Sequence, residues 1–319
     1  MTLRKFVVSI VLFSLAALGP AQAQDWPTKA VTIVHPFATG SGIDFALRAL
    51  AQKLGEKFGH TFIVENKPGA GGTVGSMAVA KAAPDGYTLL LTAVGPAVLN
   101  QLLSKSIPFD TEKDFTPVVL FGELPQLIVS SPKLGFKKLS DLVDYGRANP
   151  GKLNIGHAGP GSMGHLIGAL FLARTGVKGT LVAYRGSGPI ITDVLGGQIE
   201  AGAPIYIPPA RNVTILAVAG KDRVPFLPDI PTAREGGVDL VASTWFAFVA
   251  PAGTKADVVK KLNEEINAWL ASPEGSQQCI KAGIRPMGGT AELLAQTIKH
   301  DREFWGPVIV KENIKIEQN

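Results

Sequence analysis

One pattern occurs three times in the 319-residue sequence: a short apolar run, a loop of small residues and the start of a helix. The loops are residues 36–42, 92–96 and 159–164. A β-branched run such as residues 31–34 is typical of a buried strand, and the apolar spacing after residue 42 is typical of a helix packed on a sheet. Strands and helices that alternate at these lengths predict an α/β fold built from parallel βαβ units.

The loop at residues 36–42 allows two interpretations. It can be a plain turn between a strand and a helix. It can also present backbone N–H groups at the positive end of a helix dipole, which is a site for an anion. This loop alone favours neither. Loops at the carboxyl ends of parallel strands are where ligands bind, so three of them in two domains predict a cleft lined with N–H donors.

The first residues predict a cleaved export signal. Arg4 and Lys5 precede an apolar stretch at residues 6–18, and residues 21–23 form a small-residue cleavage site. The apolar stretch is too short to span a bilayer as a stable helix. We therefore expect a signal peptide at residues 1–23 and an exported, periplasmic protein that begins at Gln24.

Length, charge and cysteine content exclude several classes of protein. Removing residues 1–23 leaves 296 residues, which predicts two domains. The same removal leaves 29 basic against 26 acidic residues, a net charge of +3, without the basic block that nucleic-acid binding needs. Cys279 is the only cysteine, which excludes an intramolecular disulfide and a two-cysteine redox centre.

Two apolar stretches, residues 115–130 and 244–253, are long enough to cross between the domains. The segment after the second crossing is mainly helical, so it is expected to complete the first domain. The predicted boundaries are residues 24–122 plus 246–319 for a discontinuous first lobe, and residues 123–245 for the second.

Motifs for catalysis, metals and cofactors do not fit. Gly159-x-Gly161-x-x-Gly164 resembles a dinucleotide fingerprint, but no acidic residue follows between His165 and Thr192 to bind a ribose. No catalytic pair, cofactor site or metal site is predicted. His165 at a helix start can contact a ligand or serve packing and capping, and Asp44 is expected to be a helix cap.

The chain resembles the receptors of tripartite tricarboxylate transporters, the Bug family, over its whole mature length. The resemblance rests on many motifs in register, among them Trp26-Pro27, residues 31–37 with Gly40-x-x-x-Asp44, 64–72, 80–90, 150–154, 184–187, 193–198, 227–232 and 250–253. It implies a two-lobed Venus-flytrap periplasmic binding protein, each lobe a mainly parallel sheet flanked by helices, without enzymatic activity. The implied ligand is a small organic carboxylate, a di- or tricarboxylate or an aromatic acid.

The resemblance also implies a set of ligand-binding residues. The expected site comprises Phe37, Ala38, Thr39, Gly40, Ser41, Gly42, Thr92, Val94, Gly95, Pro96, Gly161, Ser162, His165, Tyr184, Arg185, Gly186, Pro204 and Tyr206. The implied partners are the membrane permease subunits of a tripartite tricarboxylate transporter, served by a monomeric receptor. A receptor that docks on a membrane sensor protein is the alternative, and a periplasmic enzyme is a third, less favoured one.

The sequence departs from the family pattern at residues 199–213. Pro204 stands where relatives carry an aspartate, and the segment is shorter. An aspartate there would suit a ligand ammonium or hydroxyl. We therefore expect a ligand without an amine, a mono- or dicarboxylate or an aromatic acid, with the ring of Tyr206 available for contact. A weakened pocket is the other interpretation of this change.

Overall fold

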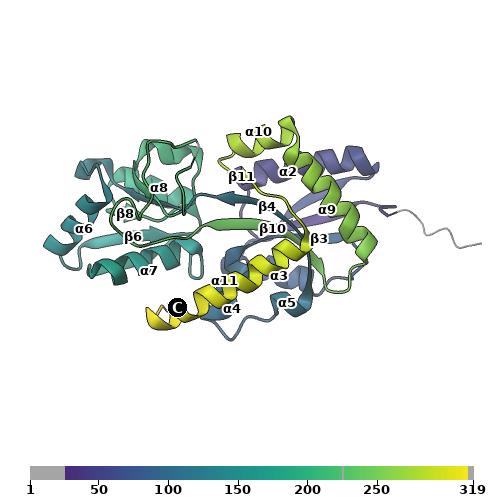
Figure 1. The fold of residues 1–319 in the computed structure, drawn as a ribbon, viewed down its shortest axis with the longest axis horizontal. Helices are drawn as coiled ribbons and strands as arrows, with labels where there is room; N and C mark the ends of the chain where they lie inside the picture. Colours follow the sequence, from purple (N-terminus) through teal and green to yellow (C-terminus); the bar gives the residue numbers. More distant parts are fainter. Residues whose placement is uncertain (1–25, 225, 315–319) are drawn as a thin grey trace, which may run out of the picture.

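The computed structural model describes residues 26–224 and 226–314 and shows two α/β lobes, each built on one sheet with helices packed against it (Figure 1). The signal peptide expected at residues 1–23 lies outside the described residues. Within the described ranges, no helix combines the length and the apolar character that crossing a membrane requires.

The first lobe contains a six-stranded sheet with the order β11-β4-β10-β3-β1-β2. Its strands are β1 (Val31–His35), β2 (Phe62–Asn66), β3 (Thr88–Ala93), β4 (Phe115–Leu124), β10 (Thr244–Pro251) and β11 (Arg285–Pro286). Its helices are α2 (Gly42–Phe58), η1 (Ala70–Gly72), α3 (Thr73–Ala80), η2 (Gly95–Leu99), α4 (Asn100–Leu103), α5 (Thr111–Asp114), α9 (Ala256–Ala271), α10 (Pro273–Lys281) and α11 (Ala291–Lys311).

The second lobe contains a five-stranded sheet with the order β7-β6-β8-β5-β9. Its strands are β5 (Leu127–Ser130), β6 (Leu153–His157), β7 (Gly179–Ala183), β8 (Ala201–Gly202) and β9 (Thr214–Val218). Its helices are η3 (Pro132–Leu134), α6 (Leu139–Ala148), α7 (Met163–Thr175), α8 (Ser187–Gly196) and η4 (Pro208–Asn212).

Both sheets are mixed, which corrects the expectation of mainly parallel sheets. In the first sheet, β1 pairs in parallel with β2 and β3, whereas β10 is antiparallel to β3 and β4. In the second sheet, β6 is parallel to β7 and β8, but β5 is antiparallel to β8 and β9. The antiparallel pairs arise at the crossings, because β4 leaves the first lobe and β10 returns to it beside β4.

Strand β1 and helix α2 show how the sequence specifies these elements. Ile33 of β1 is fully buried together with Leu47 and Leu50 of α2. The helix begins where the side chain of Ser41 accepts a bond from the N–H of Asp44, and it ends at Gly59 in the left-handed conformation. Helix α2 is thereby capped at both ends.

The two lobes share apolar packing. One buried cluster includes Leu90 of the first sheet, Leu153 of the second and Trp305 of α11. Helix α11, yellow in Figure 1, starts in the first lobe and runs towards the second.

Two further helices begin at glycine-containing turns. Helix α3 begins at Thr73, directly after the glycine-dense segment that folds into η1. The π-helical turn η2 starts at Gly95, in the loop at residues 92–96.

Candidate functional site

A buried carboxylate forms hydrogen bonds that position the loop at residues 36–41. Asp44, which is 3 % exposed, accepts bonds from the N–H of Gly40 at 3.3 Å, from Nε of Arg48 at 3.1 Å and from Nδ2 of Asn66 at 3.0 Å. Asn66 also donates to the carbonyl oxygen of Phe37 at 3.0 Å. The shape of the loop is therefore imposed by its neighbours.

The same hydrogen bonds keep the Asp44 side chain ionised. Burial disfavours the Asp44 carboxylate, but the hydrogen bonds from Asn66, Arg48 and Gly40 outweigh it and lower the pKa of Asp44. The ion pair with Arg48 compensates the negative charge at the start of α2. Asp44 was expected to be a cap; Ser41 is the N-cap, and Asp44 connects the helix to the loop.

Gly40 needs its lack of a side chain for conformational reasons. Its φ is +88°, a left-handed value that other residues adopt only with strain, and nothing lies within 4 Å of the position of an added β-carbon. Ala38, Thr39 and Gly40 are exposed, whereas Phe37 is half-buried between His35 and Phe246.

The second expected loop is buried. Thr92, the residue before the last of β3, is 2 % exposed, Val94 is fully buried, and Gly95 and Pro96 open η2. The turn places Gly95 at the carboxyl end of β3, beside the end of β1, as the topology predicts.

The third loop belongs to the second lobe. Ser162 caps α7 by accepting a bond from the N–H of His165, and the N–H of Gly161 donates to Nδ1 of His165 at 3.5 Å. The rings of His157 and His165 lie 4.7 Å apart between centroids. Burial, with a smaller contribution from His157, lowers the pKa of His165 to about 4. His165 is therefore a neutral imidazole at physiological pH.

The second and third loops meet across the two lobes. The carbonyl oxygen of Gly161 lies 3.4 Å from the position that a β-carbon on Gly95 would take. The carbonyl oxygen of Pro160 lies 3.2 Å from the corresponding position on Gly71. The loops of the two sheets thus face each other with almost no side chain between them.

The segment at residues 184–186 precedes α8 at the carboxyl end of β7. Tyr184 is half-buried and donates from its hydroxyl to Asp193 at 2.8 Å; burial and this bond raise the pKa of Tyr184 to about 12. Arg185 is exposed, and Gly186 is the N-cap of α8 with open space at its β-carbon position.

Pro204 and Tyr206 are more enclosed than an open ligand surface would be. Tyr206 is 4 % exposed, its ring centroid lies 5.1 Å from that of Phe226, and its hydroxyl accepts a bond from Nε of Arg211 at 3.0 Å. A β-carbon on Gly283 of the first lobe would collide with the Tyr206 ring. Tyr206 therefore touches the opposite lobe through a close ring-to-backbone contact.

Two structural features beside the first loop were not predicted from the sequence. The Asp44–Asn66 contact was missed, although Asn66 ends the strand next to β1 and this adjacency follows from the topology. The second feature is His35, which is fully buried and has no hydrogen-bond partner on either ring nitrogen within the described chain. Burial lowers the pKa of His35 to about 4.

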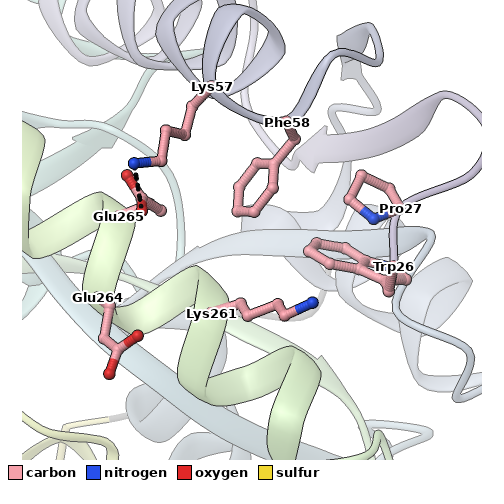
Figure 2. A pocket seen from close by; sticks show the side chains of 7 residues that line it. All are labelled: Trp26, Pro27, Lys57, Phe58, Lys261, Glu264 and Glu265. Atoms are coloured by element: carbon pink, nitrogen blue, oxygen red, sulfur yellow. Dashed lines mark ion pairs between the residues drawn. The ribbon is translucent and has the colours of Figure 1, made fainter. Parts of the chain in front are cut away.

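Neither a metal centre nor a groove at these loops is found in the part of the chain that the structure describes, and the groove of Figure 2 lies elsewhere. Within the described ranges, no three His, Cys, Asp or Glu residues are grouped to hold a metal ion. A shallow groove of about 330 Å³ is lined by Trp26, Phe58 and the ion pair of Lys57 with Glu265, which spans 3.1 Å (Figure 2). It lies at the far end of α2, about 24 Å from its N-terminus at 1.5 Å per residue.

Comparisons with known proteins identify the family of this chain. Residues 46–314 match the model of a family described as the tripartite tricarboxylate transporter family receptor, TctC. The chain is 33% identical to BugT of Bordetella pertussis over 318 residues, covering 98% of both chains.

Two solved structures with bound ligands have the same fold. A protein of R. palustris with adipate superposes with a TM-score of 0.86 at 32% identity, covering 91% of this chain and 99% of that one. MatC of Rhodopseudomonas palustris with bound malate gives 0.82 at 30% identity, covering 89% and 100%. This chain therefore belongs to the TctC family of solute-binding receptors, which includes the Bug proteins.

Proposed function

We propose that this chain is a periplasmic receptor that closes its two lobes on a small organic carboxylate. The observation that carries this proposal is the approach of Gly95 and Gly161, which brings small-residue loops of opposite sheets face to face. Helices α2 and α7 begin at such loops, where N–H groups and the helix dipole favour a negative charge. The adipate and malate bound to two relatives support the same ligand class.

The proposed site combines residues of both lobes. The first lobe contributes residues 37–42 and 92–96, and the second contributes residues 161–165 and 184–186. The proposed lobe bounds, residues 24–122 plus 246–319 and residues 123–245, are supported by β4 and β10 in the first sheet and β5 and β9 in the second. Strand pairing extends the first lobe by two residues at each crossing, to Leu124 and from Thr244. Binding favours closure because only the closed form lets one ligand contact both lobes.

We further propose that the ligand lacks an amine. The carboxylates placed beside these loops already have partners: Asp44 is paired with Arg48, and Asp193 accepts the Tyr184 hydroxyl. Pro204 is buried and offers no carboxylate. An ammonium in this cleft would therefore lose its hydration without gaining an ion pair, which is costly.

The proposal includes export, transport and the absence of catalysis. Residues 1–23 act as the cleaved signal, and membrane permease subunits take the ligand from the closed receptor. Mass spectrometry of periplasmic extracts should find a mature chain that starts at Gln24. Co-purification of the chain with permease subunits supports transport, whereas capture by a sensor protein would favour the signalling alternative.

A thermal-shift panel tests the function directly, because a ligand that binds only the folded state raises its apparent stability. The panel contains di- and tricarboxylates, aromatic acids and amino acids. At least one acid without an amine should raise the melting temperature, and the recovered acid should be chemically unchanged by NMR. A panel with no stabilising acid, or an acid that is converted, would contradict the proposal.

A further inference from the structure

The side chain of Gln126 joins the two sheets at the point where the chain crosses between them. Gln126 lies between β4 of the first lobe and β5 of the second and is 2 % exposed. Its Oε1 accepts a bond from the hydroxyl of Thr244 at 2.9 Å, and its Nε2 donates to the carbonyl oxygen of Ala203 at 2.6 Å. Thr244 begins β10 in the first sheet, whereas Ala203 follows β8 in the second.

The Ala203 end of this bridge is held firmly in the second lobe. The N–H of Ala203 donates to the carbonyl oxygen of Gly156 at 2.8 Å. The N–H of Leu127 donates to the carbonyl oxygen of Pro204 at 2.9 Å. The N–H of Ile205 donates to Oγ of Ser187 at 3.1 Å. A movement of the second lobe therefore carries Ala203 with it.

The Thr244 end is held in the first lobe. Thr244 pairs with Leu124 in the register of β10 and β4, and the following strand is buried along its whole length. A rotation of one lobe against the other must then stretch the bond to Thr244 or the bond to Ala203. Both groups are buried, so a broken bond leaves a polar atom without water, which is costly.

We propose that Gln126 is a positioning residue whose bridge between Thr244 and Ala203 favours the lobe arrangement seen here. Tyr206, three residues beyond Ala203, adds a second contact to the first lobe at Gly283. The altered segment at residues 199–206 would then act on ligand binding through the angle between the lobes as well as through direct contact. Only this consequence for affinity rests on the proposed function.

Two buried threonines provide a matched pair of variants. Thr244→Val removes the hydroxyl that bridges the sheets, while Thr254→Val removes a hydroxyl that donates to the carbonyl oxygen of Pro251 at 2.8 Å within the first lobe. The two side chains are 8 % and 6 % exposed, so both substitutions should lower the melting temperature by a similar amount, about 2–4 °C. Gln126→Met, which keeps the length of the side chain, removes both bonds of the bridge.

The test measures the distance between the two lobes without ligand. Double electron–electron resonance gives this distance between spin labels attached at Lys178→Cys and Lys260→Cys. These positions are exposed on opposite lobes, and Cys279 is fully buried with a thiol pKa that burial raises to about 12, so it does not react with the label. Thr244→Val and Gln126→Met should shift the distances to longer values, and Thr254→Val should not. Unchanged distances in the first two variants would overturn the proposal.

Affinity provides the second readout. With any acid that stabilises the wild-type protein, Thr244→Val should weaken binding about two- to tenfold, the value of one lost hydrogen bond, and Thr254→Val should leave it unchanged. Equal losses in both variants would contradict the proposal. If no acid binds the wild-type protein but the distances still shift, the proposed function fails and the role of Gln126 stands.

Discussion

The carbonyl oxygen of Gly161 lies 3.4 Å from the position of an added β-carbon on Gly95, although the two residues belong to different sheets. This approach defines how closely the loops of the two lobes meet. It also leaves room for no side chain at Gly95 beyond a methyl group.

Gly95→Val should hold the lobes apart. The branched side chain would meet the carbonyl group of Gly161, so the contacts of the closed form are lost while each lobe keeps its own packing. We expect affinity for a stabilising acid to fall more than about tenfold with little change in circular dichroism. Gly196→Val is the control, because only Cγ of Gln198, at 3.8 Å, lies near its β-carbon position. Unaltered affinity in Gly95→Val would remove this contact from the binding mechanism.

Asp44→Asn should loosen the first loop. The substitution removes the charge that Arg48 neutralises and exchanges an acceptor of the Gly40 N–H or the Asn66 amide for a donor. We expect a loss of about 1–3 kcal/mol in the free energy of unfolding, together with weaker ligand binding. Urea denaturation and calorimetric titration measure the two effects.

Asp141→Asn is the matched control for Asp44→Asn. Asp141 is also the third residue of its helix and also accepts backbone bonds, from Lys137 and Lys138, but it lies in α6. It should affect stability and leave ligand affinity at the wild-type value. If Asp44→Asn binds ligand as well as Asp141→Asn does, the loop does not depend on this carboxylate.

His35→Leu should stabilise the protein in mild acid. Burial lowers the pKa of His35 to about 4 from an ordinary value of 6.5, so the folded state binds fewer protons than the unfolded state. The stability that depends on a neutral His35 is complete above pH 6.5 and is lost as the pH falls towards 4, by about 3 kcal/mol in all. Leucine does not titrate and relieves two unpartnered ring nitrogens.

Unfolding free energies between pH 7 and 4 measure this effect. The wild-type curve should fall more steeply than that of His35→Leu, while His60→Gln, at a half-buried position of the first lobe, should follow the wild type. Parallel curves for wild type and His35→Leu would show that His35 is not titrating in the buried state.

The fold could be predicted wherever local pattern and packing agree. Strand β1 (Val31–His35) covers the β-branched run at residues 31–34, and helix α2 starts at Gly42, where the apolar spacing of a packed helix begins. The direction of the returning strand was not predictable in the same way. A buried strand such as Thr244–Pro251 is apolar on both faces whether its neighbours are parallel or antiparallel. Its antiparallel pairing, which makes the sheet mixed, is therefore seen only in the structure.

For the candidate site, the positions of the loops could be predicted from the sequence, and the contacts between them could not. The three small-residue loops lie at strand ends, as expected, because sheet topology places them there. The bond from Gln126 to Thr244 joins residues 118 positions apart, and no local pattern indicates such a pair. The enclosure of Tyr206 depends on Gly283 of the other lobe, and the sequence around Tyr206 does not indicate this contact.

Calorimetric titration of ligand-free protein with matched acids tests the central claim most directly. Malate and aspartate differ at one carbon by a hydroxyl and an amine, and adipate and 2-aminoadipate differ by the amine alone. We predict saturable binding of malate or adipate that is at least about tenfold tighter than binding of its amino partner, because an unpaired ammonium would be buried. Tighter binding of aspartate than of malate, or of 2-aminoadipate than of adipate, would contradict the account.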